Sequence, residues 1–234
     1  MTENKINILC TRPISEELLL SAKRKGINIE TVSFIETTAI DTIDVQQEIE
    51  NSLLQSATVV FTSMNAVEAV ATYLEDQEPD WQIYTMGVTC KELVKEYFGE
   101  ESIAGTASSA TELAELIVED ANTNEVIFFC GDQRRDELPS ILQSNDIEVF
   151  EIEVYHTIPT PHKITKHYDG ILFFSPSAVR SFFQKNKSEP NSIFFAIGET
   201  TQKEIEKFTS NKVIVSSESG KESLVKEMIE FFKG

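Results

Sequence analysis

Short apolar runs alternate along the chain with longer stretches in which apolar residues recur every three or four positions. The short runs are typical of buried strands, and the longer stretches are typical of amphipathic helices. Strands that alternate regularly with helices indicate βαβ units and parallel sheets. Ten strands are predicted, near residues 6–11, 28–35, 57–62, 82–87, 101–104, 125–130, 147–155, 170–175, 192–197 and 212–216. Eight helices are predicted, near residues 15–25, 64–74, 89–98, 109–119, 134–144, 177–185, 200–208 and 220–232.

This pattern occurs twice. Residues 6–37 match residues 126–157 at an offset of 120, and the match continues at an offset of about 111, where Phe61–Val67 faces Phe173–Val179 and Gly87 faces Gly198. Solenoid repeats have periods of only about 20 to 50 residues. The repeat therefore predicts one α/β design used twice, as two similar lobes with a cleft between them.

Two extended runs, Ile27–Ile40 and Ile147–Pro161, are each longer than an ordinary strand of about five or six residues. Each run has the length to leave one lobe and enter the other. One lobe would then combine residues 1–36 with residues 159–234, and the other would hold residues 37–158. Periodicity alone leaves this arrangement and two contiguous domains both open.

The charge balance limits the classes of partner. The chain has 20 basic and 39 acidic residues, a net charge of −19. Nucleic acids and anionic membranes attract basic surfaces, so neither is an expected partner. Because the N-terminus lacks a basic start followed by an apolar run, and no long apolar window occurs, we expect a cytoplasmic location.

The cysteines and histidines do not suggest a metal site. Cys10, Cys90 and Cys130 have no paired spacing, which agrees with a reducing compartment and with small buried side chains. The three histidines are five and six residues apart, which fits a solvated connector better than a zinc site. The chain also lacks glycine-rich nucleotide loops and the common hydrolase motifs.

Hydroxyl side chains gather where strands lead into helices, the edge at which parallel α/β sheets bind ligands. Each hydroxyl by itself is best interpreted as a helix cap. Several helix N-termini together would nevertheless suit carboxylates or phosphates. The junction residues considered are Ser63, Asn65, Thr89, Ser175, Ser177, Thr200 and Thr201, with Arg12, Arg134, Arg135 and Arg180 as nearby cations.

Tyr155 ends the predicted strand 147–155, within the second extended run. A buried tyrosine usually fills space and donates one hydrogen bond. At the edge of a binding cleft, its phenol could instead give a proton to a leaving group. The residue types alone favour the packing role.

The whole chain resembles the uroporphyrinogen-III synthase family. The resemblance rests on motifs in the family's order: Thr11-Arg12-Pro13, Phe61–Val67, Gly131 with Arg135 and Leu138, Val154–Thr157, Ser175–Val179 and Ile197–Thr201. It implies two flavodoxin-like lobes, each a five-stranded parallel sheet flanked by helices, joined by two extended connectors, with the active site in the cleft between them.

The resemblance also implies a reaction. The linear tetrapyrrole hydroxymethylbilane loses its hydroxyl as water, its last ring is inverted through a spiro intermediate, and the macrocycle closes to uroporphyrinogen III. The substrate carries eight carboxylates, and no metal or organic cofactor is expected. The enzyme's main task would be to fold and orient a reactive chain.

Site residues follow from the family motifs. Tyr155 would assist departure of the hydroxyl, while Thr200 and Thr201 would lie in a loop facing the substrate. The other binding positions are Arg12, Ser63, Asn65, Thr89, Arg135, Ser175 and Ser177. Two departures from the family, Cys90 and Cys130, stand where many members place threonine and arginine.

Two other functions share these features: a non-catalytic cytosolic sensor or binding protein for a small polyanion, and a regulator descended from the synthase fold. A regulator usually carries an added DNA-binding module, and the chain shows no basic extension. For the synthase, we expect a monomer that meets only its substrate and, transiently, the preceding enzyme of the pathway.

Overall fold

The computed structural model describes residues 6–120, 123–218 and 220–233. The chain divides into two compact units. Unit 1 consists of Met1–Glu36 and Ile158–Gly234, and unit 2 consists of Thr37–Thr157. Within the described residues, no helix is long and apolar enough to cross a membrane.

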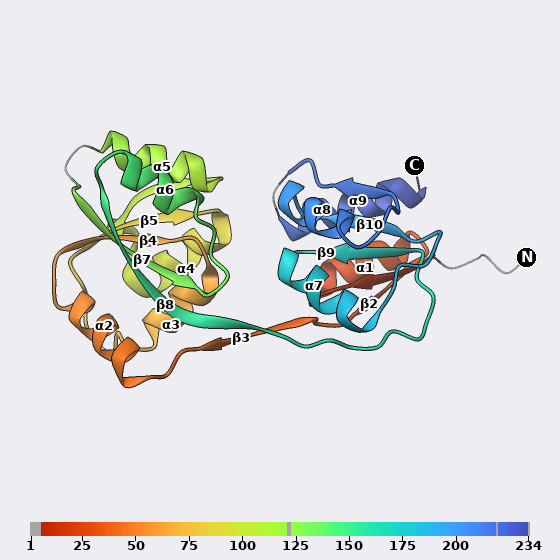
Figure 1. The fold of residues 1–234 in the computed structure, drawn as a ribbon, viewed down its shortest axis with the longest axis horizontal. Helices are drawn as coiled ribbons and strands as arrows, with labels where there is room; N and C mark the ends of the chain where they lie inside the picture. Colours follow the sequence, from red (N-terminus) through yellow and green to blue (C-terminus); the bar gives the residue numbers. More distant parts are fainter. Residues whose placement is uncertain (1–5, 121–122, 219, 234) are drawn as a thin grey trace, which may run out of the picture. The chain divides into compact units, whose positions relative to one another are not determined.

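Unit 1 is built on a five-stranded sheet in the order β11-β10-β9-β1-β2, and the pairs within it are parallel (Figure 1). Helices α1 and α9 cover one face of the sheet, and α7 and α8 cover the other. The elements are β1 (Ile6–Cys10), α1 (Glu16–Arg24), β2 (Ile27–Thr31), β9 (Gly170–Phe173), α7 (Pro176–Lys185), β10 (Ile193–Ala196), α8 (Glu199–Glu206), β11 (Val213–Val215) and α9 (Lys221–Lys233).

Unit 2 is built on a six-stranded sheet in the order β3-β8-β7-β4-β5-β6. Helices α2, α3 and α4 pack on one face, and α5 and α6 pack on the other. The elements are β3 (Ile35–Ala39), α2 (Ile43–Leu53), β4 (Ala57–Phe61), α3 (Met64–Ala71), β5 (Trp81–Met86), α4 (Val88–Phe98), the short helix η1 (Glu100–Ser102), β6 (Ile103–Ala107), α5 (Ala110–Glu119), β7 (Glu125–Gly131), α6 (Glu137–Ser144) and β8 (Glu148–Pro159).

The predicted α/β fold class is confirmed, and each sheet takes strands from both copies of the repeat. Strands β1 and β2 of the first copy share a sheet with β9 to β11 of the second, through the pair β1–β9. Strands β7 and β8 of the second copy share a sheet with β4 to β6 of the first, through the pair β7–β4. If β1 and β7 are each counted as strand 1 of their sheet, the sheet of unit 1 has the order 2-1-3-4-5, which is the flavodoxin-like order. Five strands of unit 2 have the same order, and β3 lies beyond strand 2.

The prediction of five strands in each sheet is wrong for unit 2. The first extended run breaks at residues 32–34 into β2 and β3, and β3 adds a sixth strand beside β8. Phe34, in the break, is fully buried in the core of unit 1. The second extended run remains one strand of 12 residues, β8.

Helix α2 was not predicted, although its sequence carries two signals. The hydroxyl of Thr42 caps the helix by accepting a hydrogen bond from the Val45 amide, and Ile49 and Leu53 are buried four residues apart. Such a cap followed by helical spacing is an ordinary helix start. Helix α6 begins at Glu137, three residues after its predicted start, so Arg134 and Arg135 lie before the helix.

Candidate functional site

In unit 2, the predicted site residues lie at the carboxyl edge of the sheet. Strands β8, β7, β4 and β5 are parallel neighbours, so the segments that follow them share one edge. Ser63 and Asn65 follow β4, Thr89 follows β5 and Arg135 follows β7, while Tyr155 lies in β8 near its end.

A register shift in β8 determines where Tyr155 points. Cys130 pairs with Glu153, but Gly131 pairs with Tyr155, so one extra residue is inserted at Val154. In a regular strand, successive side chains would lie on opposite faces. Because of this bulge, Val154 and Tyr155 both pack against the core beneath α3.

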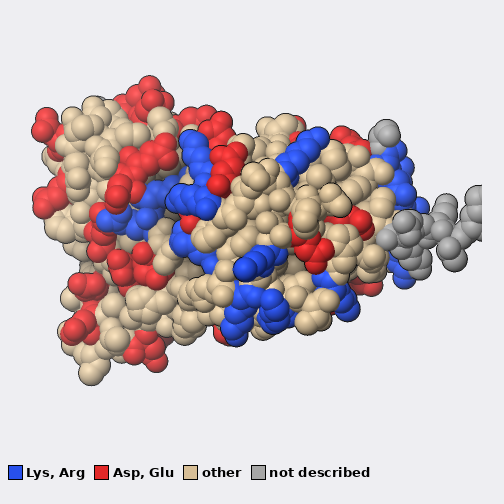
Figure 2. All heavy atoms as spheres, turned by 45° about the vertical axis from the view of Figure 1, so that its right-hand side comes forward, with Lys and Arg blue, Asp and Glu red and all other residues tan. Residues whose placement is uncertain are grey.

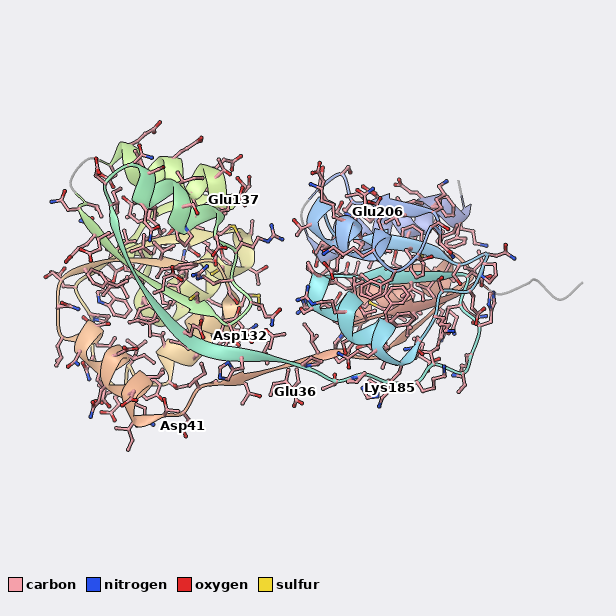
Figure 3. All side chains as sticks on the ribbon, in the orientation of Figure 1. Glu36, Asp41, Asp132, Glu137, Lys185 and Glu206 are labelled. Atoms are coloured by element: carbon pink, nitrogen blue, oxygen red, sulfur yellow. The ribbon has the colours of Figure 1, made fainter. Side chains whose placement is uncertain are left out.

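Gly131 makes room for the tyrosine ring. A Cβ atom at position 131 would lie 2.3 Å from Cζ of Tyr155, far inside van der Waals contact. The backbone around the ring is also connected, since the amide of Asp132 donates to the carbonyl of Tyr155 at 3.2 Å. The carboxylate of Asp132, labelled in Figure 3, accepts from the Thr157 amide at 2.8 Å. Gly131 and the hydrogen bonds of Asp132 therefore fix the position of the phenol.

The phenol of Tyr155 donates a hydrogen bond to the hydroxyl of Ser63 at 3.0 Å. Ser63 is the N-cap of α3 and accepts from the amide of Asn65 at 3.2 Å. Thr37, at the start of unit 2, donates to the side-chain oxygen of Asn65 at 3.5 Å. The structure thus brings together three predicted site residues, Tyr155, Ser63 and Asn65, and adds Thr37, which sequence reasoning missed.

Burial is the main cause that raises the pKa of Tyr155 above its usual value, and the hydrogen bond to Ser63 opposes it. Burial disfavours the phenolate because a charged oxygen loses hydration. The phenol is therefore protonated at neutral pH. It is half-buried, so a molecule at this edge of the sheet can reach it.

Arg135 and Thr89 are exposed and make no hydrogen bond to this group of residues in the described part of the chain. Arg134 differs, because it pairs with Asp136 and Glu151. Its charge is already balanced, which leaves Arg135 as the available cation after β7. Arg180, in unit 1, pairs with Glu204 at 3.6 Å.

In unit 1, the predicted residues also lie at one carboxyl edge, after the neighbouring strands β1, β9 and β10. Ser175 caps α7 by accepting from the amide of Ala178 at 3.2 Å, and its hydroxyl lies 3.0 Å from that of Ser177. Thr200 and Thr201 lie in the first turn of α8 and not in a loop. Thr200 is exposed, whereas Thr201 is only 2% exposed.

Arg12 follows β1 with its guanidinium 5.9 Å from the centre of the Phe174 ring. Burial lowers the pKa of Arg12. Burial is also the main cause that lowers the pKa of Lys221, the first residue of α9, and the positive charge of Arg12 lowers it further. The two cations are therefore close enough to repel each other. Sequence reasoning missed Lys221, because α9 is far from β1 along the chain.

The N-termini of α4 and α8 are open. Gly87 and Gly198, which precede α4 and α8, provide no side-chain cap, and a Cβ atom at either position would meet nothing within 4 Å. The first amides of a helix have no partner within the helix and attract anions. These glycines correspond in the repeat, so each unit has a helix that begins after such a glycine.

The cysteines have structural positions. All three are free and buried. Burial raises the pKa of Cys10 to about 11 and that of Cys130 to about 12, so both are neutral thiols at physiological pH. Among the described residues, no group of three or more His, Cys, Asp and Glu side chains is placed to hold a metal ion.

The chain matches a known protein family and resembles solved structures. Residues 16–226 match the family model described as Uroporphyrinogen-III synthase HemD. The uroporphyrinogen-III synthetase of Helicobacter pylori is similar in structure, with a TM-score of 0.70 and 14% sequence identity, over 97% of this chain and 99% of that one. A substituted uroporphyrinogen III synthase of Thermus thermophilus has a TM-score of 0.65 and 12% identity, over 97% of each chain. At such identities, the two structures show the shared fold.

Proposed function

The chain belongs to the uroporphyrinogen-III synthase family, and we propose on that basis that Tyr155 supplies the proton with which it converts hydroxymethylbilane to uroporphyrinogen III. Members of the family are cyclising lyases of haem biosynthesis. One observation carries the residue assignment: a half-buried, protonated phenol held by Ser63 at the ligand-binding edge of a parallel sheet.

In the first step, the Tyr155 phenol protonates the departing hydroxyl of the substrate. The carbon–oxygen bond breaks with electrons supplied by the adjacent pyrrole ring, and water leaves. The last pyrrole ring then attacks this cationic carbon through the ring carbon that already carries the chain, which gives the spiro intermediate. The older chain bond of that carbon breaks and re-forms at the free position of the same ring, so the ring is inverted and the macrocycle closes. The proton lost at ring closure returns to the phenolate, so the overall change is loss of one water molecule. General acids of this kind need the proton within hydrogen-bond reach.

Backbone amides and a few cations would hold the substrate's carboxylates. The open N-termini of α4 and α8 offer unpaired amides, with Thr89 and Thr200 as exposed hydroxyls beside them. Arg12 and Arg135 would add charge-assisted hydrogen bonds. Ser63, Asn65, Ser175 and Ser177 line the other helix starts, while Thr201 is buried beneath its helix and would act by positioning the first turn of α8.

Family membership favours this enzyme over a non-catalytic binding protein for a small polyanion. The substrate is then a small molecule. A monomeric state, a transient contact with the preceding enzyme and a cytoplasmic location remain predictions.

The activity is tested by supplying the purified protein with hydroxymethylbilane made in situ. Without a synthase, the bilane closes to the type I isomer. We expect the type III isomer to predominate when the oxidised porphyrins are separated by chromatography. A product that is only type I would disprove the proposed activity.

The role of Tyr155 is tested by Tyr155→Phe, which keeps the ring and removes the donor. We expect kcat to fall about tenfold, less than a general acid commonly contributes, because the bilane's hydroxyl also leaves unaided. The thermal midpoint should change little, since the ring still packs on Gly131. An unchanged kcat would mean that Tyr155 has only a packing role.

A further inference from the structure

A cavity of about 510 Å³ opens in unit 1. Its walls are the segment before β9, the end of α7 and the segment that leads into β10. It therefore lies at the amino edge of the sheet, where β9 and β10 begin. The proposed substrate residues lie at the other edge, and α7 connects the two, with Ser175 at its start and Lys185 at its end. Ten helical residues span roughly 15 Å.

The cavity is lined by four lysines. Lys163 donates to the carbonyl of Lys185 at 3.0 Å, and Lys166 pairs with Glu30 at 2.8 Å. Lys185, labelled in Figure 3, and Lys187 are exposed, and neither forms an ion pair with any described residue. Two positive charges at the rim are thus without a counter-ion in the described structure.

The lining has one acidic residue, Glu189, and it already has a partner. The carboxylate of Glu189 pairs with the ring of His167, and this contact raises the pKa of His167. An anion that enters the cavity therefore meets cations that outnumber the single carboxylate.

The interior of the cavity is apolar and partly aromatic. Tyr168 and Phe182 are buried, and Ile164, Ile171 and Phe183 complete the apolar lining. A binding site for a small molecule typically combines such a lining with a few placed polar groups, in a volume of about 300 to 1,000 Å³. This cavity has that size and that division between apolar interior and charged rim.

Buried and partly buried hydrogen bonds hold the walls in place. The side chain of Asn186 donates to the carbonyls of His162 and Phe182 at 2.7 and 2.8 Å, and accepts from the Ile164 amide at 2.8 Å. The hydroxyl of Ser192 donates to the carbonyl of Tyr168 at 2.7 Å. The cavity is therefore preformed, so a ligand would not have to order its walls.

Three other cavities, all in unit 2, provide a contrast. Their charged lining residues are all acidic: Glu48, Glu125 and Glu151 in the first, Asp80 and Glu125 in the second, and Glu78, Asp80 and Glu101 in the third. A chain with net charge −19 forms such linings readily. The lysine-rimmed cavity of unit 1 differs from these three.

We propose that this cavity binds a small amphipathic anion, with an aromatic body against Phe182 and Phe183 and a carboxylate, sulfonate or phosphate at Lys185 and Lys187. The site is separate from the proposed substrate residues and does not depend on the proposed reaction.

The test is a fluorescence titration with anilinonaphthalene sulfonate, an aromatic sulfonate that brightens in apolar sites. We expect saturable binding that Lys185→Glu combined with Lys187→Glu weakens at least tenfold, because two attractive charges become repulsive. The matched control is Lys23→Glu with Lys25→Glu, which reverses two exposed lysines with the same spacing at the end of α1. The control should bind like the parent. If the first variant unfolds, the corresponding double change to Gln should weaken binding to a smaller extent.

Two further measurements locate the site and its charge requirement. Phenylnaphthylamine, which has a similar body without the sulfonate, should bind at least tenfold more weakly. Amide chemical shifts should move most in residues 163–192 when the sulfonate is added. Equal weakening by both double variants, equal affinity for the uncharged probe, or shifts centred on the helix starts after β9 and β10 would each overturn the proposal.

Discussion

Units 1 and 2 share a strand order, but they differ at the position that matters most for the proposed chemistry. Gly131 ends β7 in unit 2, and Thr11 occupies the corresponding place after β1 in unit 1. Thr11 is buried, and its hydroxyl donates to the carbonyl of Leu172 at 2.8 Å, which ties two strands together. Gly131 has no side chain, and the ring of Tyr155 occupies the space.

The extended run that follows also differs between the two copies of the repeat. Ile35, which corresponds to Tyr155, follows the break after β2, whereas Tyr155 follows a bulge in the unbroken strand β8. One copy of the design uses this edge to join strands, and the other uses it to present a phenol. A shared fold therefore leaves the chemistry to single positions at the strand ends.

The units also differ in charge. Unit 1 carries 16 basic and 14 acidic residues, whereas unit 2 carries 4 basic and 25 acidic residues. Unit 2 alone therefore accounts for the acidity of the chain. On the face shown in Figure 2, acidic side chains are frequent over unit 2 and basic ones over unit 1. A polyanionic substrate is repelled by the field of unit 2, so we expect cations of unit 1 to contribute strongly to its capture.

The largest effect should come from making unit 2 resemble unit 1 at its strand end. Gly131→Thr would drive a side chain into the Tyr155 ring and displace the phenol from Ser63. We expect kcat to fall about 100-fold, since a small misplacement of a catalytic group can cost that much. Steady-state kinetics with chromatography of the isomers would measure it.

A double variant separates loss of the phenol from loss of folding. Tyr155→Ala in the Gly131→Thr background removes the clash, so the thermal midpoint should recover while kcat stays low. Recovery of kcat together with the thermal midpoint would contradict a role for the phenol.

The next largest effect should follow from Arg12→Gln in unit 1. If Arg12 binds a carboxylate equally in the ground and transition states, KM rises about tenfold with kcat nearly unchanged. Arg24→Gln removes an exposed charge from α1 in the same unit and serves as the control. A lower kcat with unchanged KM would assign Arg12 to the chemical step instead.

A smaller effect is expected from salt on the unmodified enzyme. Raising the ionic strength from about 0.02 to about 0.15 M shortens the Debye length from about 20 to about 8 Å. Because this screens the repulsion between unit 2 and the substrate, kcat/KM should rise about threefold. A steady fall in kcat/KM would mean that local attraction by Arg12 and Arg135 outweighs the field of unit 2.

The smallest effect should be on stability. Trp81, the single tryptophan of the chain, is buried in unit 2 and donates to the Ser52 carbonyl at 3.0 Å, so its fluorescence reports on that unit. Salt should raise its thermal midpoint by about 2 to 4 °C by screening the self-repulsion of unit 2. Hydrogen exchange should show that added salt increases amide protection less in unit 1 than in unit 2. An equal increase in both units would contradict this interpretation.

Much of the fold could be predicted from the sequence because the information is local. Apolar periodicity located the ten predicted strands, and serine caps such as Ser175 located helix starts to within a residue or two. The residues near strand ends, including Ser63 and Tyr155, could be chosen because parallel sheets expose their carboxyl edges. The missed elements include β3, which begins inside the matched segment at Ile35, and α2, which has no counterpart at a constant offset.

The contacts of the site could not be predicted, because they join residues that are distant in the chain. The bulge at Val154 changes the face on which Tyr155 lies, and strict alternation in the sequence gives no sign of it. The nearness of Arg12 to Lys221 and the fact that Arg134, but not Arg135, is paired depend on packing between elements.

Periodicity and motifs are properties of neighbouring positions, so they specify the doubled α/β design, the family and the residue types at the strand ends. The folded structure was needed to show which strands of the two copies share a sheet, how Gly131 and the bulge aim the phenol at Ser63, and where four lysines meet around an apolar cavity. Pairing, register and side-chain proximity are set by contacts between distant segments, and their energies appear only when the chain is folded.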